Sequence, residues 1–238
     1  MSYDIIIQAG QSNAEGCGRG GVSREYAENG NVLYFTGDFA ISTAREQQDG
    51  DEKVNNFSLS FAEEYINAGR LEKDRKLLIL RTAVGGTGFV DKRWGMTDDL
   101  YLRMMQMIKQ SLTLHPENRL VTFLWHQGEN DAHKEALQPH YNNLKSLIES
   151  VRTGFGYPKL PFIAGDFVNE WKTAHIEICE PVIAAIKKVC HDINYAAFVE
   201  AADLKSNNQD HGGGDDIHFC REALNILGER YFEAFVKI

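Results

Sequence analysis

The sequence predicts a three-layer α/β/α sandwich built around a mostly parallel sheet. Short apolar runs alternate along the chain with longer segments in which apolar residues recur at helical spacing. Those intervening helices are long enough to serve as the right-handed crossovers that parallel strands require. With 238 residues, of which 43% are hydrophobic, the chain can bury one large core, and no internal linker divides it. We therefore expect a single domain over residues 1–238.

The alternation can be followed in order along the chain. Residues 4–9 are mostly apolar and rich in isoleucine, and Gly10 follows them, which is typical of a buried strand that ends in a turn. Similar runs predict strands over residues 31–35, 77–84, 120–125, 162–165 and 196–201. Stripes of helical period predict helices within residues 59–66, 100–112, 141–151, 182–189 and 224–235.

Charge and terminal sequence argue against several classes of partner. The chain carries 34 acidic and 25 basic residues, a net charge of −9, and phosphate binding needs clustered Lys and Arg, so no nucleic-acid partner is expected. No apolar run is long enough to cross a bilayer, so no membrane partner is expected either. The start Met1-Ser2-Tyr3-Asp4 lacks the basic and apolar regions of a signal peptide. We expect a cytoplasmic protein, although a secreted form with its leader removed would look the same; the oligomeric state stays open.

Three polar or glycine-rich segments stand out, over residues 10–23, 85–95 and 206–216. The first two directly follow predicted strands, and the third precedes the last predicted helix. Open α/β sheets place their ligand crevices outside the carboxyl ends of the strands, and loops on a rigid scaffold commonly carry function. We therefore look for a site at this edge of the sheet.

Ser12 lies in the first of these segments, within the run Gly10-Gln11-Ser12-Asn13 that ends the first strand. A serine ahead of a helix is commonly an N-cap. Ser12 also stands where a nucleophile elbow would place a reactive hydroxyl, although the Gly-x-Ser-x-Gly pattern is absent. A backbone N–H at the start of the following helix could bind a developing oxyanion. Ser12 is therefore a candidate nucleophile, provided that a base lies elsewhere in the chain.

A base with its own partner occurs near the end of the chain, in Asp215-Asp216-Ile217-His218. Positions i and i+3 share a face of a helical turn or tight loop, so Asp215 can accept a hydrogen bond from Nδ1 of His218. That bond fixes the tautomer and leaves Nε2 to take a proton from Ser12. Asp216 is the competing partner, but it points away from the histidine on such a turn. The alternative is a solvated loop with an acidic helix cap.

Candidate oxyanion donors follow the third and fourth predicted strands. The run Gly85-Gly86-Thr87-Gly88 suits a backbone that must approach a ligand closely, and it also suits a simple tight turn. Gln127 follows the fourth strand, and its side-chain amide offers an N–H without adding a charge. Preorganised donors of these two kinds stabilise the tetrahedral intermediates of acyl transfer.

A cluster of possible metal ligands adjoins Gln127 and comprises His126, Glu129, Asp131 and His133. Their spacings match no standard zinc pattern, so we expect no metal and no other cofactor. Glu129 and Asp131 are instead expected to form hydrogen bonds within the loop and to hold Gln127 in place.

Four short blocks, in order over nearly the whole chain, resemble those of the SGNH hydrolase superfamily. They are Gly10-Gln11-Ser12-Asn13, Gly85-Gly86-Thr87 with Trp94 downstream, Gln127-Gly128-Glu129, and Asp215-x-x-His218. Within that superfamily the chain is similar to the sialate O-acetylesterase-like branch, which includes the acetylxylan esterases of carbohydrate esterase family six. The wider superfamily has asparagine in the third block, and Gln127 is the replacement expected for this branch. The resemblance implies the flavodoxin-like fold of SGNH hydrolases.

The resemblance also implies a role for each residue. Ser12 would be the nucleophile, His218 the general base and acid, and Asp215 the group that orients His218. The oxyanion hole would comprise the backbone N–H groups of Ser12 and Gly86 and the side chain of Gln127, with Gly85 as the alternative to Gly86. The same blocks supply the candidate substrate contacts, which are Gln11, Asn13, Trp94 and Glu129.

These roles predict a serine esterase that removes O-acetyl groups from a carbohydrate through an acetyl-enzyme on Ser12. An acetylated xylo-oligosaccharide and a sialic-acid-like sugar are both open as substrates. One alternative is a short-chain lipase or thioesterase-type SGNH hydrolase, which a long apolar groove would favour. A catalytically dead carbohydrate-binding protein would release no acetate, and a metal-dependent hydrolase would lose its activity in a chelator.

Overall fold

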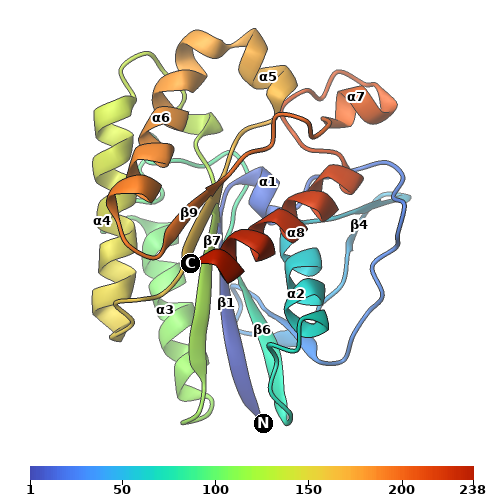
Figure 1. Cartoon of the computed structure of the whole chain (residues 1–238), viewed down its shortest axis with the longest axis vertical. Helices are drawn as coiled ribbons and strands as arrows, with labels where there is room; N and C mark the ends of the chain where they lie inside the picture. The colour runs from blue at the N-terminus through green and yellow to red at the C-terminus, as the bar shows by residue number, and fades with distance from the viewer.

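A seven-stranded sheet of order β3-β2-β6-β1-β7-β8-β9 forms the centre of the computed structural model, which describes all 238 residues (Figure 1). Every neighbouring pair of strands is parallel except β2 and β3. The predicted α/β class with a mostly parallel sheet is confirmed. The strands are β1 (Ser2–Gly10), β2 (Val32–Phe35), β3 (Ile41–Thr43), β6 (Arg75–Arg81), β7 (Arg119–His126), β8 (Phe162–Gly165) and β9 (Ala196–Val199).

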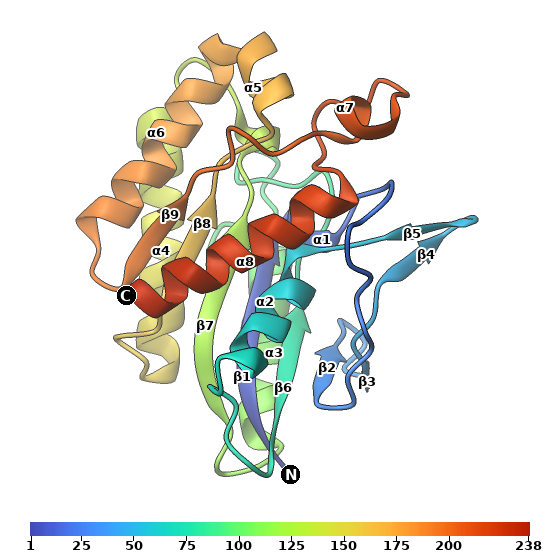
Figure 2. The ribbon, with the colours of Figure 1, turned by 45° about the vertical axis from the view of Figure 1, so that its right-hand side comes forward.

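Helices cover both faces of this sheet, as Figures 1 and 2 show. One face is covered by α3 (Asp99–Thr113), α4 (Leu137–Phe155) and α6 (Ile176–Asp192), and the other by α2 (Phe57–Asn67) and α8 (Arg221–Lys237). All five contain the stripes that predicted them. Short helices lie in the loops that follow strands: α1 (Ser12–Glu15), a 3₁₀ turn at Glu129–Asp131, α5 (Asn169–Ala174) and α7 (Asn207–His211).

The alternating side chains of β1 show how the sheet separates two cores. Ile5 and Ile7 pack with α3, α4 and α6, whereas Ile6 packs with α2 and α8, and all three are fully buried. Burial of each side chain contributes about 1.5–3 kcal/mol relative to exposure. Because β1 lies between β6 and β7 and is buried on both faces, its carboxyl end is a fixed point from which the next loop starts.

Two strand features were not predicted from the sequence. The edge strand β3 has only three residues, mostly exposed, and it runs antiparallel to β2. A separate hairpin of β4 (Gln47–Asp49) and β5 (Glu52–Val54) consists almost entirely of exposed polar residues. Such short polar strands carry no apolar period, so pairing between segments, rather than local pattern, decides their structure.

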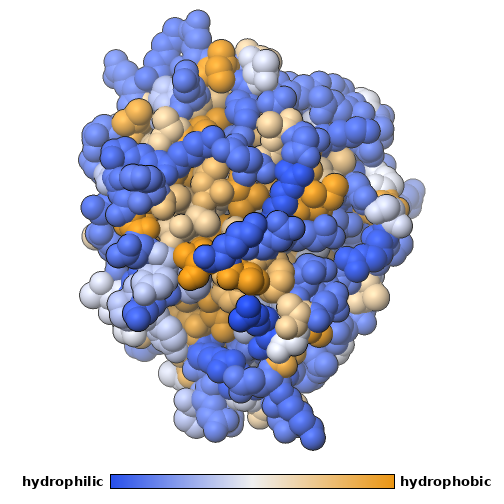
Figure 3. Space-filling view, viewed as in Figure 1, coloured by the Kyte–Doolittle hydropathy of each residue, from blue (hydrophilic) through white to orange (hydrophobic).

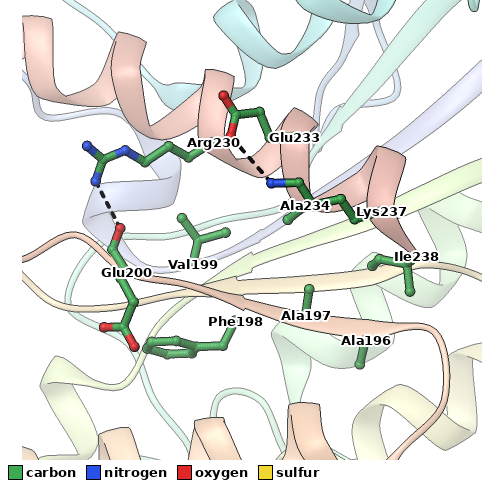
Figure 4. Close-up of a pocket in the computed structure, with 10 residues that line it drawn as sticks. All are labelled: Ala196, Ala197, Phe198, Val199, Glu200, Arg230, Glu233, Ala234, Lys237 and Ile238. Carbon is green, nitrogen blue, oxygen red and sulfur yellow. Dashed lines mark hydrogen bonds and ion pairs between the residues drawn. The ribbon is translucent and has the colours of Figure 1, made fainter.

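Hydrophobic side chains gather in the middle of the face shown in Figure 3, around the C-terminus. A recess of about 530 Å³ lies there between β9 and the end of α8, and Phe198, Val199 and Ala234 contribute to its lining (Figure 4). None of the predicted site residues lines this recess. None of the helices combines the length and the apolar character needed to cross a bilayer.

Candidate active site

Ser12 lies at the carboxyl edge of the sheet, directly after β1, where the backbone of Gly10 passes close to that of His126. Gly10 has a φ of 126°, and a Cβ atom at this position would clash with the carbonyl group of His126. Gln11 then donates its backbone N–H to that carbonyl (2.9 Å), and α1 begins at Ser12. Gln11 is the N-cap residue, so the Ser12 hydroxyl is not used as a helix cap.

The structure brings Ser12, His218 and Asp215 together, although the first two lie 206 residues apart in the chain. Nε2 of His218 lies 2.9 Å from Oγ of Ser12. Nδ1 of His218 lies 2.8 Å and 3.0 Å from the two carboxylate oxygens of Asp215, the residue preferred over Asp216. The three side chains therefore form one continuous hydrogen-bonded chain at the end of β1.

The charge on Asp215 sets the tautomer of the histidine. Partial burial raises the pKa of Asp215, but hydrogen bonds from Asn207 and His218 outweigh that effect and hold the pKa below its usual value. A charged carboxylate can only accept, so Nδ1 of His218 carries the proton that it donates. The lone pair on Nε2 then faces the Ser12 hydroxyl, which can donate its proton to it.

Asn13 holds the backbone on both sides of His218. Its Nδ2 donates to the carbonyl of Ile217 (3.1 Å), and its Oδ1 accepts from the N–H of Phe219 (3.0 Å). The same Nδ2 donates to Oε1 of Glu129 (2.9 Å). Asn13 is fully buried and Glu129 is 6% exposed, so both support the loop that carries the histidine, and their role as substrate contacts stays a prediction.

Gln11 and Trp94 are also bound within the protein, and their assignment as substrate contacts stays a prediction. Oε1 of Gln11 accepts from the backbone N–H of Asn130 (3.1 Å), and Gln11 is buried. Trp94 is fully buried, donates from Nε1 to Thr87 (3.0 Å), and packs edge-on against Trp125. Neither face of its indole is open to a sugar ring.

The backbone N–H groups of Ser12 and Gly86 have no acceptor within the protein. Gly85, in contrast, donates its N–H to Oε2 of Glu15 (2.7 Å). A Cβ atom built at Gly85 would lie 3.6 Å from Cβ of Ser12, so this glycine loop passes directly over the serine. The engaged N–H of Gly85 leaves Gly86 as the available donor of the pair.

The amide of Gln127 is buried beside this loop and is held from several sides. Its Nε2 lies 3.0 Å from Oδ2 of Asp131, 3.3 Å from the carbonyl of Thr87 and 3.4 Å from Oε1 of Gln11. The first contact is an ordinary hydrogen bond, whereas the other two are long and weak. One hydrogen of this amide is thus firmly bound to Asp131, and the second is bound only weakly.

The four residues considered as metal ligands do not share one centre. Nε2 of His126 lies 3.7 Å from Oε1 of Glu129, and Nδ1 of His133 accepts from the backbone N–H of Glu135 (3.2 Å). Asp131 accepts from the backbone N–H groups of Phe89 and Val90 (3.0 Å each) and lies 3.3 Å from His140. His126 is fully buried, and burial lowers its pKa to about 3, so it is neutral at pH 7. Burial raises the pKa of Glu129 in the same region. No group of three or more such side chains converges in the structure.

A family comparison decides to which group of proteins this constellation belongs. The model of the family described as "Carbohydrate esterase, sialic acid-specific acetylesterase" matches residues 2–237, almost the entire chain. The chain belongs to this family. No curated protein sequence matches it.

Solved structures similar to this acetylesterase family member support the same fold. A protein from Arabidopsis thaliana has a TM-score of 0.81 at 22% identity, with 100% of this chain and 99% of that chain covered. The protein named NanS has a TM-score of 0.80 at 18% identity, with 99% and 97% covered. A carbohydrate acetylesterase from Xanthomonas citri has a TM-score of 0.64 at 14% identity and covers 97% of this chain and 55% of its own.

Sequence reasoning missed two residues of this acetylesterase-family site. Glu15 holds the Gly85 loop, and Asn207 contacts Asp215 (2.8 Å) from α7. A signal for α7 was present, because Ser206 and Gln209 form a capping box of the Ser-x-x-Gln type. No comparable pattern marks the contact between Asn207 and Asp215.

Proposed function

We propose that the protein is a carbohydrate O-acetylesterase that works through an acetyl-enzyme on Ser12. The observation that carries the proposal is the hydrogen-bonded chain from Ser12 through His218 to Asp215, in a chain whose family is that of the carbohydrate esterases. A hydroxyl, a neutral imidazole and a carboxylate in this order make an activated nucleophile.

The proposed reaction starts when Oγ of Ser12 attacks the acetyl carbonyl and its proton moves to Nε2 of His218. The tetrahedral intermediate collapses as the C–O bond to the sugar breaks, and the sugar oxygen takes the proton from Nε2. Water then attacks the acetyl-enzyme with His218 again as the base, and acetate leaves as Ser12 regains its proton. Asp215 stabilises the imidazolium that forms in each half-reaction.

The oxyanion of the intermediate is assigned to the N–H groups of Ser12 and Gly86, because both are free of internal acceptors. Gln127 is the third donor and uses the hydrogen that is only weakly held at 3.3–3.4 Å. It gives up those weak contacts when it binds the oxyanion, so its contribution is smaller than that of Gly86.

Arg81 favours an acidic sugar of the sialic-acid type over a neutral xylo-oligosaccharide as the substrate. Its Nη2 donates to the carbonyl of Glu15, one helical turn from Ser12, and its guanidinium stacks on Tyr34 at 4.9 Å. No acidic side chain pairs with it. It borders a polar recess of about 620 Å³ whose lining includes Gln47, the basic Arg45 and Lys53, and the acidic Glu28 and Glu46. An unpaired guanidinium beside a polar recess suits a substrate carboxylate.

The test is acetate release from 4-nitrophenyl acetate, an O-acetylated sialic acid and acetylated xylo-oligosaccharides, measured with and without a chelator. We expect wild type to be active and Ser12→Ala and His218→Ala to lose activity by roughly a millionfold in kcat, because triad residues act as a unit. Ser23→Ala, which removes an exposed hydroxyl bonded to Glu222, is the matched control and stays active.

An inert wild type, or full activity in Ser12→Ala, would overturn the proposal. Loss of activity only in the chelator would favour a metal-dependent hydrolase. A preference for long acyl esters over acetyl esters would instead favour the lipase or thioesterase alternative.

A further inference from the structure

Asn207 is a fully buried amide that joins three segments of the site. Its Nδ2 donates to the carbonyl of Cys17 (3.0 Å) and to Oδ2 of Asp215 (2.8 Å), and its Oδ1 accepts from the N–H of Arg19 (2.9 Å). Its own backbone N–H donates to the carbonyl of His218 (2.8 Å). Every polar group of this residue except its carbonyl is thus bound to the loops around the triad.

The chemistry of the partners fixes which way this amide points. A carbonyl and a carboxylate can only accept, so the NH₂ group must face Cys17 and Asp215, and the N–H of Arg19 requires the amide oxygen. Apart from groups of His218, Asn207 supplies the one hydrogen bond to the Asp215 carboxylate. The Asp215 side chain is 36% exposed, so without this bond water would compete for its orientation.

We propose that Asn207 is a positioning residue that holds the Asp215 carboxylate in line with Nδ1 of His218. The inference rests on the proposed function and adds to the triad a fourth residue from outside the predicted motifs. Asn207 touches no reacting atom. It binds one carboxylate oxygen at 2.8 Å and so keeps the other directed at Nδ1, also at 2.8 Å.

The test is a double-mutant cycle of Asn207→Ala and Asp215→Ala, measured on acetyl esters. Asn207→Ala removes a hydrogen bond to a charged group, and the energy of such a bond corresponds to about a ten- to a hundredfold loss in kcat. We expect KM to change less than about twofold. In the Asp215→Ala background we expect the same substitution to change kcat by less than about twofold. Losses that multiply would overturn the proposal, because Asn207 would then act independently of Asp215.

Asn208→Ala is the matched control on the same helix. It removes bonds to Glu170 (2.7 Å) and to the N–H of Gly214 (3.0 Å) but no contact with the carboxylate, so kcat should change less than about threefold. An equal loss in both variants would mean that general loosening of the loop is responsible. Asn207→Leu, which is similar in shape but cannot donate a hydrogen bond to Asp215, repeats the cycle if the alanine variant fails to fold.

A readout independent of activity separates this proposal from the proposed function. The low-field proton resonance of Nδ1–H of His218, identified by its absence in His218→Ala, reports the bond to Asp215 directly. We expect it to move upfield or to broaden beyond detection in Asn207→Ala and to persist in Asn208→Ala. An unchanged resonance in Asn207→Ala would refute the positioning role, whether or not the protein cleaves esters.

Discussion

His126 makes the stability of the protein sensitive to acid, and this can be tested by replacing it with a residue that does not titrate. The ring is fully buried between Phe57 and Phe219, its Nδ1 lies 3.2 Å from the hydroxyl of Tyr231, and its Nε2 has no hydrogen-bond partner. Burial lowers the pKa of His126 from 6.5 to about 3. The folded protein therefore keeps the imidazole neutral at a pH where the unfolded chain binds a proton.

The sign and the size follow from proton linkage. A group whose pKa is lowered by folding contributes stability that is fully present above pH 6.5 and is lost as the pH falls toward 3. The cost approaches about 1.4 kcal/mol per pH unit well inside that window and is about half of that at pH 6.5, where the unfolded histidine is half protonated. Lowering the pH from 6.5 to 4.5 should therefore cost about 2.3 kcal/mol through His126 alone. For a chain of this size that corresponds to a fall of roughly 5–9 °C in Tm.

The assay is urea unfolding of wild type and His126→Gln at pH 6.5 and pH 4.5. Acidic groups with lowered pKa values, such as Asp215 and Asp203, destabilise both proteins in acid and cancel in the comparison. Glu129, 3.7 Å from the ring, is likewise present in both. We expect wild type to lose about 2.3 kcal/mol more than the variant over this range. Equal losses in the two proteins would refute the reasoning.

Three further substitutions test the assignments at the site. Gln127→Ala should lower kcat by about a hundredfold with little change in KM, measured by steady-state kinetics, and a loss below about threefold would remove it from the oxyanion hole. Asn13→Ala leaves the buried N–H of Phe219 without a partner, so urea unfolding should show a loss of about 2–4 kcal/mol together with a lower kcat; an unchanged midpoint would contradict this. Trp94→Phe removes one bond to Thr87 and should cost about 1 kcal/mol while KM stays within about twofold, whereas a large rise in KM would make Trp94 a substrate contact after all.

Local pattern was sufficient to predict most of the fold. Strands such as β1 and helices such as α4 are long, amphipathic or fully apolar, so burial of their side chains imposes a period that can be read in the sequence. The hairpin β4–β5 is exposed and polar, and it leaves no such period. Its existence depends on how two neighbouring segments pair, which is a property of the folded chain.

For the candidate site, the sequence indicated which residues come together but not how their side chains are oriented. The block that contains Ser12 directly follows β1, whereas the block that contains His218 lies between α7 and α8, and the fold brings the two together. The direction in which each side chain points was not predictable. Trp94 belongs to one of these blocks, yet its indole is fully buried in the core. Asn207 and Cys17 lie 190 residues apart, and nothing in either segment marks their contact. A short motif indicates which residues meet but not which of them face the substrate.

The contact between Ser12 and His218 closes a small ring of bonds, and this explains why so many polar groups are buried beneath the site. Asn13 follows the nucleophile in the chain and binds the backbone on both sides of the histidine, whose ring returns to Ser12. Each link is an ordinary hydrogen bond of 2.9–3.1 Å, and together they hold Oγ of Ser12 and Nε2 of His218 in contact. The cost is stability, because atoms such as Oε2 of Glu129 are buried without a partner. The buried polar side chains that hold Ser12 against His218 are therefore the same ones that reduce the stability of the protein.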